Sequence, residues 1–170
     1  MEITWLSNRA AGSLLHLSSL PSDTGIGNLG QSAYEFIVFL KKAGMSYWQM
    51  CPVGPTGYGD SPYQVFCSSA GNPYFIDWKP LVENGLIKDY ELEPLRQLSS
   101  TETDFGGLHK EFFKLARTTS ERFRKDLNVL EKHYGEFNEF ITKHKRWLNA
   151  HCMFHSIKAI NDEKPWWDWA

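Results

Sequence analysis

The residues best suited to chemistry stand in one loop, CPVGPTGYGDSPYQ, which spans residues 51–64. Its glycines permit turns that are closed to other residues and its prolines fix φ, so the backbone is stiff. Its aromatic and polar side chains include Tyr58, Asp60, Ser61 and Tyr63. A rigidly held tyrosine ring can stack on the C–H face of a sugar while carboxylate and hydroxyl groups bond the sugar hydroxyls. The rings could equally pack the loop itself, so stacking and packing both remain open.

A second glycine-rich segment, GIGNLG, places Gly25, Gly27 and Gly30 in the G-x-G-x-x-G spacing of a dinucleotide-binding turn. The turn is long for that motif because Pro21 and further residues precede it. The next apolar run also ends without the acidic residue that would contact a ribose. We therefore expect a flexible strand-to-helix loop rather than a nucleotide site.

Three histidines are candidates for a site. His151 and His155 are four residues apart on a predicted helix, a spacing that can bind a metal ion. No glutamate follows His151, so the zincin motif is absent and a packed or surface pair is expected. His16 lies in the first predicted strand, where a hydrogen-bonded interior role is favoured and a substrate-facing role stays open.

Composition narrows the class of protein. The chain has 170 residues, 42% of them apolar, which suits one folded domain rather than a disordered segment. A net charge of −2 gives no electrostatic case for nucleic acid or an anionic membrane. No apolar run approaches the roughly 18 residues of a membrane span, and the N-terminus lacks the pattern of a signal peptide. Three reduced thiols of a cytosolic protein are expected at Cys51, Cys67 and Cys152.

The first half of the chain reads as a βαβ unit. Residues 13–20 predict a strand, residues 31–44 an amphipathic helix, and the run from residue 45 to the opening loop a second strand. Parallel strands need such a crossover, and ligands in α/β folds bind beyond the carboxyl ends of the strands. The loops at 21–30 and 54–64 both lie at that end. Two parallel strands do not make a sheet that stands alone, however, and few other strands are indicated.

Signals for element ends are also present. Ser32 with Glu35 predicts a capping box at the start of the first helix, and Gly44 fits the residue just after its end. A short strand is predicted at residues 74–78, and a short helix at 80–86 that Gly85 ends. From about residue 108 to 160 the chain is expected to be helical and amphipathic. The apolar residues that suggest two helices there are Phe112, Leu115, Ala116 and Phe123, then Phe137, Phe140, Ile141, Trp147, Leu148, Cys152 and Phe154.

The combined motifs resemble one known family. The runs LLHLSSLPSDTGIGNLG, GPTGYGDSPYQ and AGNPYFID, with PWWDW near the end, are similar to the N-terminal part of amylomaltases, which are 4-α-glucanotransferases or disproportionating enzymes. The resemblance covers about residues 9 to 169. The pairing of GPTGYGDSPYQ with AGNPYFID is the most specific feature.

This resemblance implies an α/β fold: the first two strands of a (β/α)8 TIM barrel, followed by a mainly helical insertion subdomain. Residues 1–80 would hold the first βα units with the substrate loop 54–64, and residues 81–170 the insertion and a following helix. A whole barrel takes about 250 residues, so the barrel would be incomplete. The implied enzyme is cytoplasmic, needs no cofactor or metal, and moves segments of α-1,4-glucan between maltodextrins or glycogen fragments.

The resemblance also implies roles for individual residues. Tyr63 matches the ring that stacks on the sugar beside the cleavage point, and Ser61 lies next to it. Tyr58 resembles an aromatic residue of a secondary glucan-binding site. Asp60 is expected to fix the loop or bond a sugar hydroxyl.

The catalytic carboxylates are expected elsewhere. The implied reaction is a retaining double displacement, in which an aspartate attacks, a glutamate serves as acid and base, and a second aspartate stabilises the distorted sugar. In this family all three come from later strands, expected beyond residue 170, so Asp77 and Asp104 are not assigned to catalysis. We expect an inactive N-terminal fragment. The alternatives are a free-standing glucan-binding or regulatory module and half of a split enzyme. The sequence does not indicate the oligomeric state.

Overall fold

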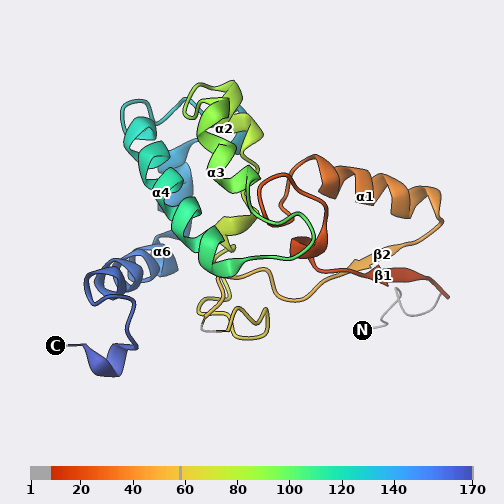
Figure 1. Ribbon diagram of the computed structural model, residues 1–170, viewed down its shortest axis with the longest axis horizontal. Helices are drawn as coiled ribbons and strands as arrows, with labels where there is room; N and C mark the ends of the chain where they lie inside the picture. Colours follow the sequence, from red (N-terminus) through yellow and green to blue (C-terminus); the bar gives the residue numbers. More distant parts are fainter. Residues whose placement is uncertain (1–8, 58, 170) are drawn as a thin grey trace.

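The structure is a computed structural model that describes residues 9–57 and 59–169. Figure 1 shows the sheet and α1 at one end, a cluster of helices in the middle, and α6 leading away toward the C-terminus. The helices are α1 (Gln31–Lys42), α2 (Lys79–Glu83), α3 (Glu93–Arg96), α4 (Phe105–Phe123), α5 (Glu131–Tyr134) and α6 (Phe137–Ile160). Short 3-10 turns lie at η2 (Leu17–Ser19), η3 (Pro73–Phe75), η4 (Asp89–Leu92) and η5 (Trp166–Asp168).

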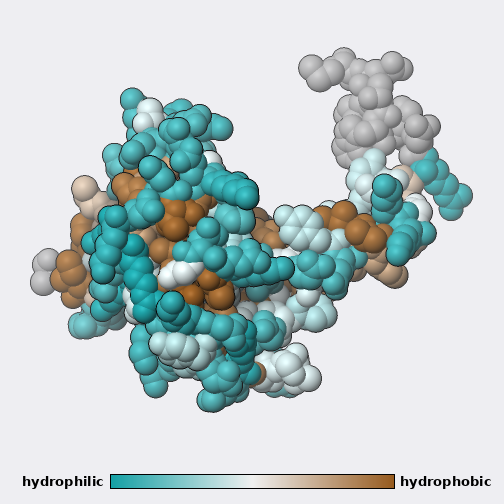
Figure 2. All heavy atoms as spheres, turned by 90° about the horizontal axis from the view of Figure 1, so that it is seen from above, coloured by the Kyte–Doolittle hydropathy of each residue, from teal (hydrophilic) through white to brown (hydrophobic). Residues whose placement is uncertain are grey.

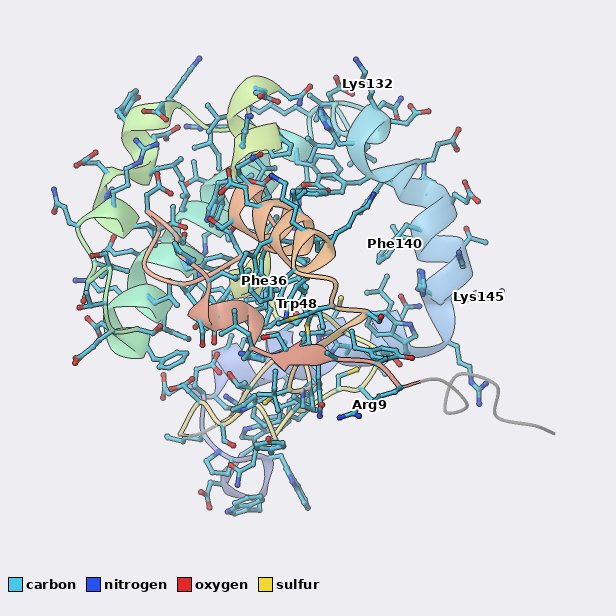
Figure 3. All side chains as sticks on the ribbon, turned by 90° about the vertical axis from the view of Figure 1, so that its right-hand side faces the viewer. Arg9, Phe36, Trp48, Lys132, Phe140 and Lys145 are labelled. Atoms are coloured by element: carbon cyan, nitrogen blue, oxygen red, sulfur yellow. The ribbon has the colours of Figure 1, made fainter. Side chains whose placement is uncertain are left out.

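The predicted βαβ unit is confirmed. Strands β1 (Gly12–Leu14) and β2 (Tyr47–Gln49) pair in parallel, with Ser13 opposite Trp48, and α1 forms the crossover between them. Phe36 of α1 packs edge-on against Trp48, with ring centroids 4.9 Å apart (Figure 3). The helix is therefore fixed on the sheet by an aromatic contact.

The first strand is shorter than the predicted 13–20, because the chain turns at η2. His16 Nδ1 lies 2.7 Å from Ser18 Oγ, and the Ser19 amide donates to the His16 carbonyl at 3.0 Å. These local bonds compete with the sheet ladder. The turn also carries Leu17 into the core, where it is 1% exposed.

The predicted capping box at the start of α1 is wrong. The N-cap is Gly30, two residues before Ser32, and the helix begins at Gln31. The Gly30 amide donates to Asn28 Oδ1 at 2.9 Å, which holds the entry to the helix. Glu35 instead accepts a bond from the Gln31 side chain, so Ser32 caps nothing.

The predicted helix ends at glycine are confirmed. Gly44 has φ of 70°, and the Met45 amide donates to the Leu40 carbonyl at 3.0 Å, which closes a Schellman motif after α1. Gly85 has φ of 72° after α2, where the Leu86 amide bonds back into the last turn. A left-handed residue is required at both places, and glycine adopts it without a Cβ clash.

The strand predicted at 74–78 is a 3-10 turn instead. Pro73 has no amide hydrogen to give to a ladder, and Asn72 Oδ1 accepts the Tyr74 amide at 3.0 Å. The turn places Tyr74 and Phe75 in the core. Local side-chain bonding here overrides the apolar run.

The loop at 21–30 is packed, not loose as expected. Gly27 lies so close to the preceding turn that an added Cβ would stand 2.2 Å from the Leu17 carbonyl oxygen. Its amide donates to the Ser18 carbonyl at 3.1 Å. Thr24 and Ile26 of the same loop are buried. The glycine therefore serves close backbone approach, one of the roles glycine has in any tight loop.

The hydrophobic core lies where α2, α3 and α4 meet η2 and η3. Phe112 of α4 contacts Tyr74 edge-on at 5.0 Å and Trp78 at 5.1 Å between ring centroids. Leu95 of α3 and Leu108 of α4 are each 1% exposed. Residues near the N-terminus and in α4 thus share one core.

The helical expectation for residues 108–160 is confirmed in type, and α4 buries its apolar stripe, but α6 does not. The region forms α4, α5 and α6, and none of the described residues of α6 is buried. Phe140, for example, is 45% exposed (Figure 3). In Figure 2, brown apolar atoms are also visible on the projection that α1 forms.

No helix within the described ranges has both the length and the apolar character needed to cross a membrane.

Candidate functional site

The loop after β2 is a tied hairpin. Thr56 and Val65 form an antiparallel bridge, and the Phe66 amide donates to the Pro55 carbonyl at 3.0 Å. Gly54 stands against Val65, since an added Cβ would lie 3.1 Å from that side chain. The stiffness predicted from proline and glycine is therefore reinforced by cross-hairpin bonds. We call residues 54–66 the aromatic hairpin.

The tip of the aromatic hairpin is a tight turn. Gly59 and Asp60 have φ of 83° and 53°, so two successive residues are left-handed. The Asp60 amide donates to the Gly57 carbonyl at 3.1 Å. Ser61 Oγ accepts the Tyr63 amide at 3.4 Å, which makes Ser61 a turn-forming residue next to the ring. Tyr58 lies outside the described residues.

Tyr63 projects from the aromatic hairpin. Its side chain is 75% exposed. The Cys51 sulfur lies 3.4 Å from its hydroxyl oxygen, within hydrogen-bond distance. This bond raises the pKa of Tyr63 above its ordinary value, so the phenol stays neutral at physiological pH. A ring that is held at its hydroxyl and exposed on its faces is suited to stacking, which favours that alternative over internal packing.

His16 links the two loops at the carboxyl ends of the strands. Its Nε2 lies 3.4 Å from the Pro52 carbonyl oxygen, just before the aromatic hairpin. Its ring packs edge-on against Phe75 at 5.6 Å. These contacts, with the Ser18 bond, fit the hydrogen-bonded role expected for His16.

The acidic residues that sequence analysis set aside hold local structure. Asp77 Oδ1 accepts the Lys79 amide at 3.0 Å before α2. Asp104 accepts the Gly107 amide at 3.0 Å and so caps α4. Across residues 9–57 and 59–169, no three His, Cys, Asp or Glu side chains gather in a way that could hold a metal ion.

One contact of the site was not predictable from sequence. Phe66, at the base of the aromatic hairpin, packs against Phe154 and His155 of α6 at 6.4 and 6.2 Å between ring centroids. These residues are almost ninety positions apart in the chain, and no local pattern signals the contact. It ties the hairpin to α6.

A family model described as 4-alpha-glucanotransferase matches residues 15–170. The chain belongs to the 4-alpha-glucanotransferase family. A relative of that name from Clostridium butyricum is 41% identical over 165 residues, covering 91% of this chain and 31% of the relative. One from Thermus thermophilus is 39% identical over 161 residues, covering 95% and 31%. This member of the family therefore spans about a third of the length of the relatives it matches.

A solved structure of the family agrees with the fold. The amylomaltase from Streptococcus agalactiae in complex with acarbose matches with a TM-score of 0.85 at 31% identity. The match covers 95% of this chain and 32% of that structure. The two parallel strands and the helices are thus part of the α/β fold of amylomaltase.

Proposed function

We propose that this chain contributes the aromatic wall of a glucan site to a 4-alpha-glucanotransferase. The enzyme would transfer α-1,4-glucan segments between maltodextrins or glycogen fragments by a retaining double displacement, without metal or cofactor, in the cytoplasm. The observation that carries this proposal is the exposed ring of Tyr63 on a hairpin tied beyond the carboxyl end of β2. Membership of the family supports the substrate class.

In this proposal Tyr63 stacks on the sugar next to the cleavage point, and Ser61 shapes the turn beside it. Asp60 is left-handed at the tip, where it fixes the turn and can bond a sugar hydroxyl. Tyr58 is proposed for a secondary glucan contact. The chemistry needs two carboxylates about 5 Å apart. We place them in the two-thirds of the relatives' length that this chain does not span, so the chain alone has no transferase activity.

The proposed architecture follows from the same comparison. β1 and β2 would be the first two strands of a (β/α)8 barrel, with residues 1–80 as its first βα units. Residues 81–170 would form a mainly helical insertion and a following helix. The exposed apolar residues of α1, such as Tyr34 at 66% and Phe39 at 56%, support further chain packing on this part of the molecule.

The test of glucan binding is calorimetric titration of the 170-residue chain with maltoheptaose. Tyr63→Ala should weaken binding about three- to tenfold, the range for loss of one aromatic stack, with little change in thermal stability. Tyr90→Ala is the matched control, because Tyr90 is also 75% exposed but lies in η4. A large loss of stability with unchanged affinity would instead assign Tyr63 to packing.

The catalytic part of the proposal is tested with maltotriose. The chain alone should release no glucose and form no maltopentaose, while a full-length relative does both. Production of glucose and maltopentaose by the chain alone would overturn the placement of the carboxylates. Activity that appears only on mixing with the remaining two-thirds of a relative would favour the split-enzyme alternative, and tight glucan binding without any such rescue would favour a binding module.

A further inference from the structure

The base of the aromatic hairpin contacts both its own backbone and α6 through Phe66. Gly57 lies under the Phe66 ring, where an added Cβ would stand 2.9 Å from the ring carbon Cζ. The same ring meets Phe154 at 6.4 Å and His155 at 6.2 Å between centroids, while Phe66 stays 49% exposed. Lys158 Nζ lies 5.8 Å from the ring centroid, within cation–π range. Phe66 therefore contacts both the hairpin and α6.

The histidine that Phe66 contacts belongs to a close pair. The rings of His151 and His155 are 4.5 Å apart between centroids, at an interplanar angle of 64°. His155 Nε2 is buried and has no hydrogen-bond partner among the described residues. Burial lowers the pKa of His155 below its ordinary value of 6.5, and the neighbouring His151 lowers it further. A second positive charge at this distance would be repelled in a poorly solvated place.

The surrounding charges do not offset that repulsion fully. Lys158 of α6 opposes a proton on His155, while Glu163 in the turn after α6 favours one. Glu163 is itself ion-paired with Lys158, so its charge is already shared. From the hairpin, Phe66 presents only an uncharged ring.

We propose that Phe66 is a positioning residue that fixes the aromatic hairpin on α6, and that protonation of His155, which Phe66 contacts, loosens this contact. The consequence for glucan rests on the proposed role of Tyr63, three residues before Phe66. While Phe66 contacts α6, the Tyr63 ring is held in one position. When this contact loosens, the hairpin samples other positions, which lowers the fraction of molecules that can bind glucan.

The direction of the pH effect follows from linkage. An undocked His155 loses part of the burial that lowers its pKa, so it takes up a proton at a higher pH than docked His155 does. Docking is therefore fully favoured above about pH 6.5 and is weakened as pH falls from there toward the lowered pKa. The hairpin should be tightest in neutral and mildly basic solution.

The deciding experiment is an NMR titration of the 170-residue chain from pH 8 to pH 5. Amide signals of residues 54–66 should shift together with a midpoint below 6.5. His155→Phe, or His155→Gln if the first variant folds poorly, should abolish that joint shift. His144→Gln is the matched control, because His144 lies on α6 but its ring contacts are with Phe140 and Trp147. Hairpin signals that do not respond to pH would overturn the proposal. So would hairpin signals that shift as much in the folded His155 variant as in the unmutated chain.

Maltoheptaose binding separates this inference from the proposed function. Phe66→Ala should weaken maltoheptaose binding at pH 7.5 by about fivefold. The variant should also lose most of the fall in affinity that the unmutated chain shows between pH 8 and pH 5. Absence of binding by the unmutated chain at any pH would refute the proposed glucan role while the NMR titration still tests the contact of Phe66 with α6. Binding that is present but insensitive to Phe66→Ala would refute the positioning role alone.

Discussion

Helices α4 and α6 are the two long helices of the described chain, and they place their large apolar and ring-bearing side chains in opposite ways. In α4, Leu108, Phe112 and Leu115 follow one stripe, and all three are buried in the core. In α6 the rings of His144, Trp147 and His151 contact one another along the helix surface, and no described residue is buried. The difference shows that helical spacing of apolar residues predicts a helix. Whether the apolar face is buried depends on another surface packing against it.

The arrangement of charges differs in the same way. In the core region, Arg122 of α4 makes a two-pronged bond to Glu91 at 2.6 and 2.8 Å and also reaches the Leu86 carbonyl. On the α6 side, Lys158 pairs with Glu163 within one short turn. The first pair joins two elements, whereas the second joins neighbours in sequence. The first should contribute to tertiary stability and the second should not.

The largest expected effect is that of truncating a core leucine of α4. Leu108→Ala should lower the free energy of unfolding by about 3–4 kcal/mol, because a fully buried leucine leaves a cavity. Leu148→Ala on α6, a partly buried position, should cost less than about 1 kcal/mol. Urea denaturation followed by circular dichroism measures both. Equal losses would mean that α6 shares the core and that the contrast between the helices is wrong.

The next effect tests whether the loop before α1 belongs to the core region. Gly27→Ala should cost about 2–3 kcal/mol, because its Cβ would meet backbone oxygen atoms that cannot move aside. Gly71→Ala is the control, since Gly71 has neither a positive φ nor an atom within 4 Å of an added Cβ. The thermal midpoints of the two variants give the comparison. A tolerated alanine at Gly27 would show that this loop is free to shift.

The smallest effect concerns the two ion pairs. Arg122 lowers the pKa of Glu91 from 4.5 to about 2, helped by the Lys88 amide. The pair therefore stabilises the fold above pH 4.5, and this contribution is lost as pH falls toward 2. Glu91→Gln should cost about 1–2 kcal/mol at pH 7 and flatten the stability profile below pH 4.5.

Glu163→Gln is the matched variant on the α6 side. Half-exposed Glu163 should contribute less than about 0.5 kcal/mol. Urea midpoints measured between pH 7 and pH 2 would show both behaviours. A profile that keeps its full acid slope in Glu91→Gln would mean that other carboxylates carry it.

The sequence predicts the parts of the fold that depend on local rules. The crossover of α1, its end at Gly44 and the turn at Gly85 all follow from period and glycine chemistry. The strand expected at 13–20 was shortened because His16 bonds to Ser18, and the capping box failed because Asn28 and Gly30 start the helix first. Such competition between local bonds is not visible in apolar spacing.

In the candidate site, too, the features set by local sequence were predictable and the contacts between distant segments were not. The stiffness of the aromatic hairpin follows from its prolines and glycines, and Tyr63 is exposed as a stacking ring requires. The bond from Cys51 and the contact of Phe66 with α6 depend on how distant segments meet. Sequence reasoning therefore reached the residues of the hairpin but not what holds them.

The parallel pairing of β1 with β2 sets an order of events during synthesis. Because Gly12 pairs in the register of Tyr47, β1 has no partner until roughly 35 further residues emerge, about 2–7 s at ordinary translation rates. The intervening α1, twelve residues long, is only marginally stable alone. Phe36 waits in water for Trp48 over the last 12 of these residues, about 0.6–2.4 s, so part of the nascent chain's apolar surface is exposed during that time.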